Sequence, residues 1–304
     1  MSPWIRFVAR LAVAGALLYT IATWIVSPAE LLAGAASADP YWLLLAAMMT
    51  PVGLLLQWWK WRRLVQASLP EIGEADILLS LFTGFGLGLL TPGRLGELGR
   101  GAHWPGARAR ATALAAADRL VSSLVTLAAG AAWAVYCMPI SWGVWCGLAM
   151  IGIGVSWRQF GSRLAAQLAL RWDMTCLTDI PRNVWMSNTL AALLFNVVFC
   201  LQMFCLLRAT GAIALWALFA IPAMFALKTL LPISFMDLGV REAAGVVVLG
   251  GVGVAATTAV QASLMLFGLN VLLPGVAGLL VLSIGRQTTH FSSPSQRIEL
   301  VHVR

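Results

Sequence analysis

The chain has 304 residues, of which 60% are hydrophobic and 11% are charged, and its mean hydropathy is +0.86. An ordinary globular domain carries about 25% charged residues, so the composition excludes a soluble enzyme. Several apolar stretches approach the ~20 residues that cross a bilayer as a helix, which indicates an all-α polytopic membrane protein. The net charge of +8 belongs mostly to loops beside the lipid, and it favours anionic headgroups over nucleic acid as a partner.

Six segments are predicted to be full crossings, each apolar over about 17 to 25 positions: residues 4–26, 41–59, 112–136, 140–157, 184–207 and 261–284. They place residues 1–285 in a single transmembrane domain. Arginines punctuate the apolar residues of 158–182, a pattern typical of a helix on the inner membrane surface. The tail over 286–304 is rich in Ser, Thr and Gln, which predicts a disordered cytoplasmic segment.

Two further apolar segments are predicted to be broken, re-entrant helical hairpins. Residues 76–90 would extend only about 22 Å as a helix, short of a ~30 Å hydrocarbon core, and glycines interrupt them. If residues 76–90 crossed the membrane completely, the arginines that follow them would lie on the opposite side from the arginines after residue 60. The positive-inside rule disfavours that arrangement. If residues 212–258 form a second hairpin, most basic residues lie in the cytoplasm, as the positive-inside rule favours. Hydropathy alone leaves open whether 212–231 spans the membrane.

An internal repeat links the two hairpins. Residues 90–99 align without gaps on residues 230–239, and both segments have the pattern L-x-P-x4-[D/E]-L-G. When 140 is added to the first residues of three early predicted segments, the resulting positions lie close to the first residues of three later predicted spans. Two repeats are therefore predicted, over about 4–137 and 140–285. Because an odd number of crossings separates the motifs, the repeats should be inverted, an arrangement typical of transporters that open alternately to each side.

Eight charged residues gather around the broken segments or at the head of a span: Arg94, Glu97, Arg100, Asp118, Arg119, Asp237, Arg241 and Glu242. Charge inside a membrane costs at least about 2.5 to 3.5 kcal/mol per group, so we expect these residues to contact a substrate. Guanidinium groups suit a lipid phosphate, because their planar fork donates bidentate hydrogen bonds. The specific hypothesis is that Glu97, Arg100, Arg241 and Glu242 line one polar cavity, and that its two arginines bind the phosphate.

Ion pairing within the motifs is the alternative interpretation of the same residues. It predicts pairs of Arg94 with Glu97, of Arg119 with Asp118, and of Arg241 with Asp237 or Glu242. In that case the motifs only fasten the hairpins. The two interpretations are compatible, because a paired arginine can still present a donor edge to a phosphate.

Catalysis and metal binding have little support in the sequence. No G-x-S-x-G motif occurs, no histidine lies among the eight charged residues, and the five cysteines form no C-x-x-C pair. We expect no cofactor, no metal site and no disulfide. No G-x-x-x-x-G-K-[ST] motif occurs either, so uphill transport would need an ion gradient or a partner ATPase.

The chain resembles the flippase-like transmembrane family, which comprises the membrane region of lysylphosphatidylglycerol synthases and its stand-alone relatives. The resemblance is carried by residues 91–97 with Arg100, by the sequence Asp-Arg-Leu at 118–120, and by residues 231–232 with 238–242. The match spans most of the chain. Two departures affect the headgroup chemistry: Leu-Phe-Gly at 266–268, where relatives often have an arginine, and Phe-Met at 235–236, where many have two glycines.

The resemblance implies flippase or scramblase-like movement of a lipid with a phosphate-containing or polar headgroup. Its relatives suggest an anionic phospholipid, an aminoacyl-lipid, a polyprenyl phosphate or a hopanoid-type lipid as substrate, and a separate lipid-modifying enzyme as partner. The alternatives are a non-catalytic accessory subunit and a transferase, although the lysyl-transferring domain of the full synthases is not found in the chain. The excess of arginine over lysine suggests a GC-rich bacterial genome and hence a bacterial inner membrane. The positive-inside rule favours both termini in the cytoplasm.

Overall fold

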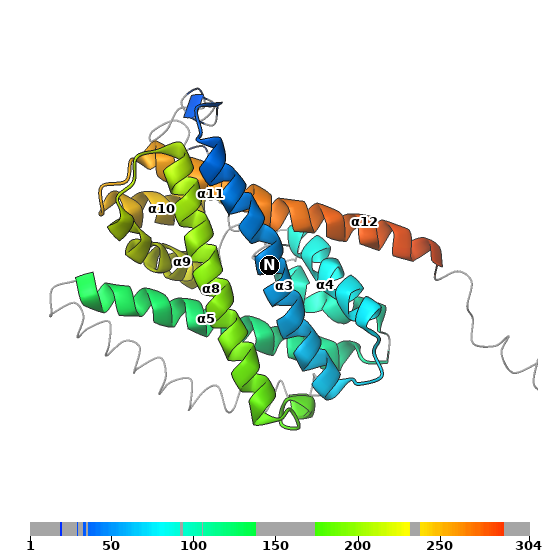
Figure 1. The fold of residues 1–304 in the computed structure, drawn as a ribbon. Helices are drawn as coiled ribbons and strands as arrows, with labels where there is room; N and C mark the ends of the chain where they lie inside the picture. The colour runs from blue at the N-terminus through cyan, green and yellow to red at the C-terminus, as the bar shows by residue number, and fades with distance from the viewer. Residues whose placement is uncertain are drawn as a thin grey trace, which may run out of the picture.

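The structure, a computed structural model, describes residues 19, 29, 33–34, 36–91, 94–104, 106–137, 174–231 and 238–288. Within these ranges every regular element is a helix (Figure 1). The elements in chain order are α3 (Pro40–Ser68), α4 (Glu74–Leu89), the 3₁₀ helix η2 (Leu95–His103), α5 (Arg108–Cys137), η4 (Met174–Leu177), α8 (Arg182–Thr210), η5 (Leu215–Ala220), α9 (Ile221–Leu230), α10 (Val240–Gly250), α11 (Ala256–Phe267), the π-helix η6 (Gly268–Leu272) and α12 (Leu273–Thr288).

Among the described residues, four helical segments are long and apolar enough to cross a membrane: Pro40–Ser68, Arg108–Trp133, Arg182–Thr210 and Ala256–Ser283. They confirm four of the six predicted crossings, because they contain or overlap 41–59, 112–136, 184–207 and 261–284. The predicted crossing 140–157 lies outside the described residues, and so does 4–26 apart from residue 19. Residues 158–173 of the surface helix and 289–304 of the tail lie outside them as well. A total of six crossings therefore stays a prediction.

The first predicted hairpin is a short helix followed by a reversal of the chain. Helix α4 has 16 residues, which gives a length of about 24 Å, shorter than a bilayer core. Helix η2 then runs back along it. A Cβ atom added to Gly96 would lie 2.1 Å from the Leu87 carbonyl oxygen, and one added to Gly84 would lie 2.6 Å from Arg100 Cγ. Only glycine permits this close approach of η2 to α4.

The second predicted hairpin has a similar form. Helices η5 and α9 make a continuous apolar segment, Leu215–Leu230, which is too short to rank with the four candidate spans. Helix α10 follows and packs against α9. Residues 232–237, which join the two helices, lie outside the described residues. The length of the segment favours the hairpin over a complete crossing by 212–231.

Helices α3 and α8 correspond to each other in the predicted repeat and pack side by side. Each has 29 residues, and their first residues lie 142 positions apart. They run antiparallel: the Asp39 amide donates to the Ala209 carbonyl at 2.8 Å, and Gln202 Nε2 donates to Thr50 Oγ1 at 3.0 Å. Figure 1 shows this pair running through the whole molecule, with α5 passing behind its lower half and α12 extending to the right from its upper half.

Each hairpin packs on the last long helix of the other half through a glycine. Gly278 of α12 lies against Phe82 and Gly86 of α4, whereas Gly130 of α5 lies against Pro222 and Ala226 of α9. The two contacted pairs are separated by 140 residues, the offset of the sequence repeat. The same contact thus occurs twice, as a two-fold relation between the halves would require. Inverted topology itself stays a prediction, which the antiparallel course of α3 and α8 supports.

Two hydrophobic clusters lie toward opposite ends of the α3–α8 pair. The Trp104 end contains the C-terminal part of α3, the start of α5 and the start of α8, with Leu69, Trp104, Ala111 and Val184 in its core. The Leu249 end contains the start of α3, the end of α8 and the α10–α11 connection, with Ala46, Leu207, Leu249 and Val254 in its core. These ends define the two sides to which a membrane topology can be assigned.

Candidate functional site: a cationic cavity between the two halves

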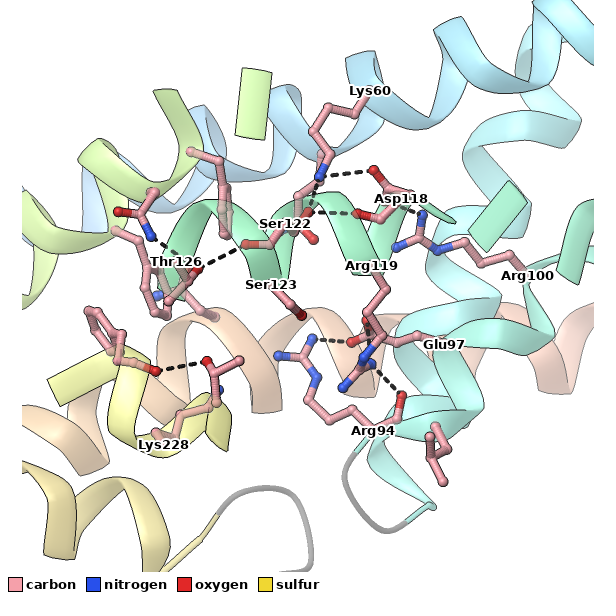
Figure 2. A pocket seen from close by; sticks show the side chains of 18 residues that line it. Lys60, Arg94, Glu97, Arg100, Asp118, Arg119, Ser122, Ser123, Thr126 and Lys228 are labelled. Carbon is pink, nitrogen blue, oxygen red and sulfur yellow. Dashed lines mark hydrogen bonds and ion pairs between the residues drawn. The ribbon is translucent and has the colours of Figure 1, made fainter. Parts of the chain in front are cut away.

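A cavity of about 480 Å³ lies between the helices of both predicted repeats (Figure 2). Among its described lining residues, five carry a cationic side chain and only two carry a carboxylate. The charged residues are Lys60, Arg94, Glu97, Arg100, Asp118, Arg119 and Lys228. The rest of the wall consists mainly of amides, hydroxyls and phenylalanines. The cavity therefore combines an excess of positive charge with an apolar side.

Asp118 on α5 is the centre of a buried ionic group, the Asp118 cluster, formed by Lys60, Arg100, Asp118 and Asn188. Lys60 Nζ lies 3.0 Å from Asp118 Oδ1 and donates to Ser122 Oγ at 2.6 Å. Arg100 Nη1 donates to Asp118 Oδ2 at 3.2 Å, and Asn188 Nδ2 donates to Oδ1 at 3.1 Å. Through Asp118, the cluster ties α3, η2, α5 and α8 together.

Aromatic rings hold Arg100 in place from its other side. The Arg100 guanidinium carbon lies 4.8 Å from the centre of the Trp61 ring, a cation–π geometry. Trp61 in turn donates to Ser80 Oγ at 2.7 Å and stacks parallel to Trp104, with ring centroids 6.4 Å apart. Only 6% of the Arg100 side chain is exposed. Arg100 therefore serves the packing of η2 more than it serves the open cavity.

A second ionic group, the Glu97 cluster, consists of Arg94, Glu97 and Arg119. Glu97 forms an ion pair with Arg94, and its Oε2 accepts from Arg119 Nη1 at 3.3 Å. Arg119 Nη1 also donates to the Arg94 carbonyl oxygen at 2.9 Å. The Arg94 side chain is 21% exposed and that of Arg119 is 36% exposed. In this cluster two guanidinium groups share one carboxylate and remain accessible.

The backbone of Arg94 is in the left-handed region, with φ 56° and ψ 30°. It is the only such non-glycine residue that the described part of the chain contains. This conformation costs an L-residue roughly 1 to 2 kcal/mol, and such strain concentrates at functional sites. The strained turn places the Arg94 guanidinium beside Glu97 at the start of η2.

The opposite wall of the cavity is aromatic. Phe195 and Phe199 of α8 stack with ring centroids 5.5 Å apart, and Phe225 of α9 lies 4.7 Å from Phe199. Asn196 lies on the same wall and donates to Thr126 Oγ1 of α5 at 3.2 Å. An amphiphilic molecule could therefore place a charged group against η2 and α5 and an apolar group against α8 and α9.

Arg241 and Glu242 lie apart from this cavity, at the start of α10, and both are buried. Arg241 Nη2 is 2.5 Å from Glu242 Oε1, and the guanidinium lies over the Phe267 ring at 5.3 Å. Glu242 Oε2 accepts from the Gly239 amide at 2.7 Å and so caps α10. Neither residue is part of the cavity wall, whereas Glu97 and Arg100 are. The hypothesis that all four residues line one cavity is therefore wrong for Arg241 and Glu242.

Residues 7–278 match the family described as the lysylphosphatidylglycerol synthase TM region. The chain belongs to this family. Together with the four apolar helical spans, the match makes the chain a multi-pass helical membrane protein. A search of curated protein sequences finds no match. The resemblance on the motifs around Arg94, Asp118 and Arg241 is thereby confirmed as family membership.

Two of the three predicted ion pairs are present in the structure, and one prediction is wrong. Arg94 pairs with Glu97, and Arg241 pairs with Glu242. Asp237, the other predicted partner of Arg241, lies outside the described residues. Asp118 does not pair with Arg119 as predicted; it binds Lys60 and Arg100. Adjacent helical residues face different directions, and Figure 2 shows Asp118 and Arg119 on opposite sides of α5.

Sequence reasoning missed several polar residues of the site. Lys60 of α3 was not among the candidate residues, yet its side chain is buried in the Asp118 cluster. Asn188, Gln202 and Asn270 lie within apolar spans and each binds a side chain of another helix. The sequence could have indicated these three residues, because polar side chains inside a membrane span usually face the bundle interior.

Proposed function

We propose that this protein moves a lipid with a phosphate-containing headgroup across the bilayer. The observation that carries the proposal is the cavity itself, where the described lining residues include five cations and two carboxylates that face three phenylalanines between helices of both halves. Phosphate oxygens are strong acceptors for such cations, and lipid chains suit the aromatic wall. A cavity of about 480 Å³ is within the range of small-molecule sites, about 300 to 1,000 Å³.

The Glu97 cluster is the best phosphate site within the cavity. Its arginines are 21% and 36% exposed, whereas Lys60 and Arg100 are 4% and 6% exposed and hold Asp118. Arg94 and Arg119 both present guanidinium groups to the cavity. A phosphate at the cluster would accept bidentate hydrogen bonds from them. Arg94 and Arg119 thus replace Arg100 as the leading candidates for a phosphate contact. Arg100 is instead a positioning residue.

Alternating access fits the arrangement of the two halves. The hairpin of each half packs on the last long helix of the other half through equivalent contacts of Gly130 and Gly278. Inverted repeats that interlock in this way allow one cavity to open to either side in turn. We infer that the halves move against each other around the α3–α8 pair, where corresponding helices meet.

The distribution of arginine favours a cytoplasmic position for the Trp104 end. Arg62, Arg63, Arg108, Arg110 and Arg182 belong to helix segments at that end, whereas Arg208 belongs to the other end. With an inner-membrane location, the cytoplasmic leaflet would then supply the lipid to the Glu97 cluster. An accessory role beside a lipid-modifying enzyme is the competing function.

The proposal is tested with purified protein in liposomes that contain acyl-labelled lipids. Reduction of the label in the outer leaflet reports movement of lipid between leaflets. We expect faster movement of labelled phosphatidylglycerol than of a labelled glycosyl diacylglycerol, which lacks phosphate. Absence of movement for every labelled lipid, even with an imposed membrane potential or pH gradient, would overturn transport and leave the accessory role.

A further inference from the structure

A chain of amide hydrogen bonds leads from the α3–α8 contact to the cavity wall. Gln202 of α8 is buried, and its Nε2 donates to the Ala46 carbonyl at 2.9 Å and to Thr50 Oγ1 at 3.0 Å. Its Oε1 accepts from Asn270 Nδ2 at 2.9 Å. Asn270 belongs to the π-helix η6 and lines the cavity.

Backbone carbonyls fix the direction of this chain, because a carbonyl oxygen can only accept. The Ala46 carbonyl orients Gln202, and the Leu266 carbonyl accepts from Asn270 Nδ2 at 3.3 Å. Both amide protons of Asn270 are therefore used inside the protein. The group of Asn270 that remains for a ligand is its Oδ1, an acceptor, and no donor to it occurs within the described ranges.

This acceptor complements the charged side of the cavity. Lysine and arginine side chains carry only donors, and the carboxylates Glu97 and Asp118 are each engaged by two cations. The cationic side chains of the Glu97 cluster would therefore offer a bound headgroup hydrogen-bond donors for its phosphate and no acceptor for its own donor groups. Asn270 offers the same cavity a neutral oxygen that can accept from the ligand.

The location of the two amides also indicates a functional role. Gln202 lies in the span Arg182–Thr210, which contains the most apolar 18-residue stretch of the four spans. Polar side chains in such spans mark substrate pathways more often than those in soluble helices. Asn270 lies in a π-helix, a rare conformation that is frequent at functional sites.

We propose that Asn270, oriented by Gln202, recognises a hydrogen-bond donor of the lipid headgroup, a hydroxyl or ammonium group beyond the phosphate. Asn270 is then a specificity-determining residue, and Gln202 is a positioning residue. The inference rests on the proposed lipid transport. It adds that the preferred lipid is a phosphodiester whose headgroup carries a donor.

Matched pairs of labelled lipids test this inference in the same liposomes. Phosphatidylglycerol is compared with phosphatidylpropanol, which has equal charge and lacks the hydroxyls, and phosphatidylethanolamine with phosphatidylcholine, which lacks the ammonium protons. Wild-type protein should move at least one donor-bearing lipid about fivefold faster than its partner, the effect of roughly one net hydrogen bond. The pair that shows the preference identifies the donor.

Asn270→Leu should abolish the preference, so that the donor-bearing and the donor-free lipid of each pair move at equal rates. Because the preference is a ratio within one preparation, a smaller amount of folded protein does not alter it. Gln202→Met is a second variant, which leaves Asn270 in place without its orienting partner and should weaken the preference. Thr50→Val is the matched control: it removes one bond of Gln202, yet the Ala46 carbonyl still orients the amide, so the preference should persist.

Equal rates within both lipid pairs for the wild-type protein would overturn this inference and leave phosphate-lipid transport intact. A preference that survives in Asn270→Leu would overturn it as well, and the amide chain would then only fasten helices. If the wild-type protein moves none of the four lipids, the inference falls together with the proposed function.

Discussion

Two carboxylates in the cavity each hold two cations, and their surroundings give them different roles. Asp118 lies among buried partners, with Lys60 and Arg100 almost fully enclosed. Glu97 holds Arg94 and Arg119, whose side chains remain open to the cavity. We assign structure mainly to the first cluster and ligand contact mainly to the second. The sequence marked five of these six charged residues, all except Lys60, but could not distinguish the roles, because exposure depends on distant helices.

The Asp118 cluster predicts a specific pattern of coupling in a double-mutant cycle. Asp118→Asn should cost about 3 to 5 kcal/mol of unfolding free energy, because it leaves two buried cations without their counter-charge. Adding Lys60→Met should cost less than the sum of the single changes. Adding Arg119→Gln should be additive within about 0.5 kcal/mol. Unfolding in detergent measures both cycles, and stronger coupling of Asp118 to Arg119 than to Lys60 would contradict the described geometry.

The left-handed backbone of Arg94 predicts an unusual order of stability. Arg94→Gly should be more stable than Arg94→Ala by about 1 kcal/mol, because glycine adopts positive φ without strain. Both variants lose the same guanidinium, so their difference isolates the backbone. The midpoints of thermal unfolding in detergent provide the comparison. Equal midpoints, or a more stable alanine variant, would show that φ 56° is not a strained conformation in solution.

At the scale of elements, the equivalent glycine contacts hold each hairpin to the opposite half. A Cβ atom at Gly278 would lie 2.0 Å from the Phe82 carbonyl oxygen, and one at Gly130 would lie 2.2 Å from Ala226 Cβ. The first contact is with backbone, which cannot move aside without shifting α4. The motif repeat around residues 90 and 230 predicted that the hairpins correspond. It carried no information on the partner helix of each hairpin.

Gly278→Ala should therefore weaken the packing of α4 on α12 and cost about 1 to 3 kcal/mol, the range for overpacked sites. Gly250→Ala is the matched control, because a Cβ at Gly250 meets no atom within 4 Å, and it should change stability little. Both are measured by thermal unfolding in detergent. A Gly278 variant as stable as the Gly250 variant would mean that the two helices are not in close contact.

At the scale of the whole molecule, much of the architecture could be predicted from the sequence. The lengths of apolar runs revealed four spans and the short first hairpin, since these depend on local composition. The partners of Asp118 and the separation of Arg241 from the cavity could not be predicted in this way. They depend on how helices from distant segments are rotated against each other, and adjacent charges such as Asp118 and Arg119 carry no local signal of that rotation.

The predicted inverted topology puts two accessible positions on opposite sides of the membrane. Single cysteines at Gly106, at the Trp104 end, and at Gly250, at the Leu249 end, would both point into open space. In a background without native cysteines, an impermeant thiol reagent should label Gly106→Cys from the cytoplasmic side only and Gly250→Cys from the external side only. Labelling of both positions from the same side would remove the inverted topology and the alternating access built on it.

The central claim is that the arginines of the Glu97 cluster form the path of a lipid phosphate. Its most direct test is the initial rate of phosphatidylglycerol movement in liposomes for wild-type protein, for the double variant Arg94→Gln with Arg119→Gln, and for the Gly250→Ala control. We predict a loss of about tenfold or more in the double variant, because charge-assisted hydrogen bonds are lost, and an unchanged rate in the control. A double variant that folds and moves the lipid at the wild-type rate would contradict the claim.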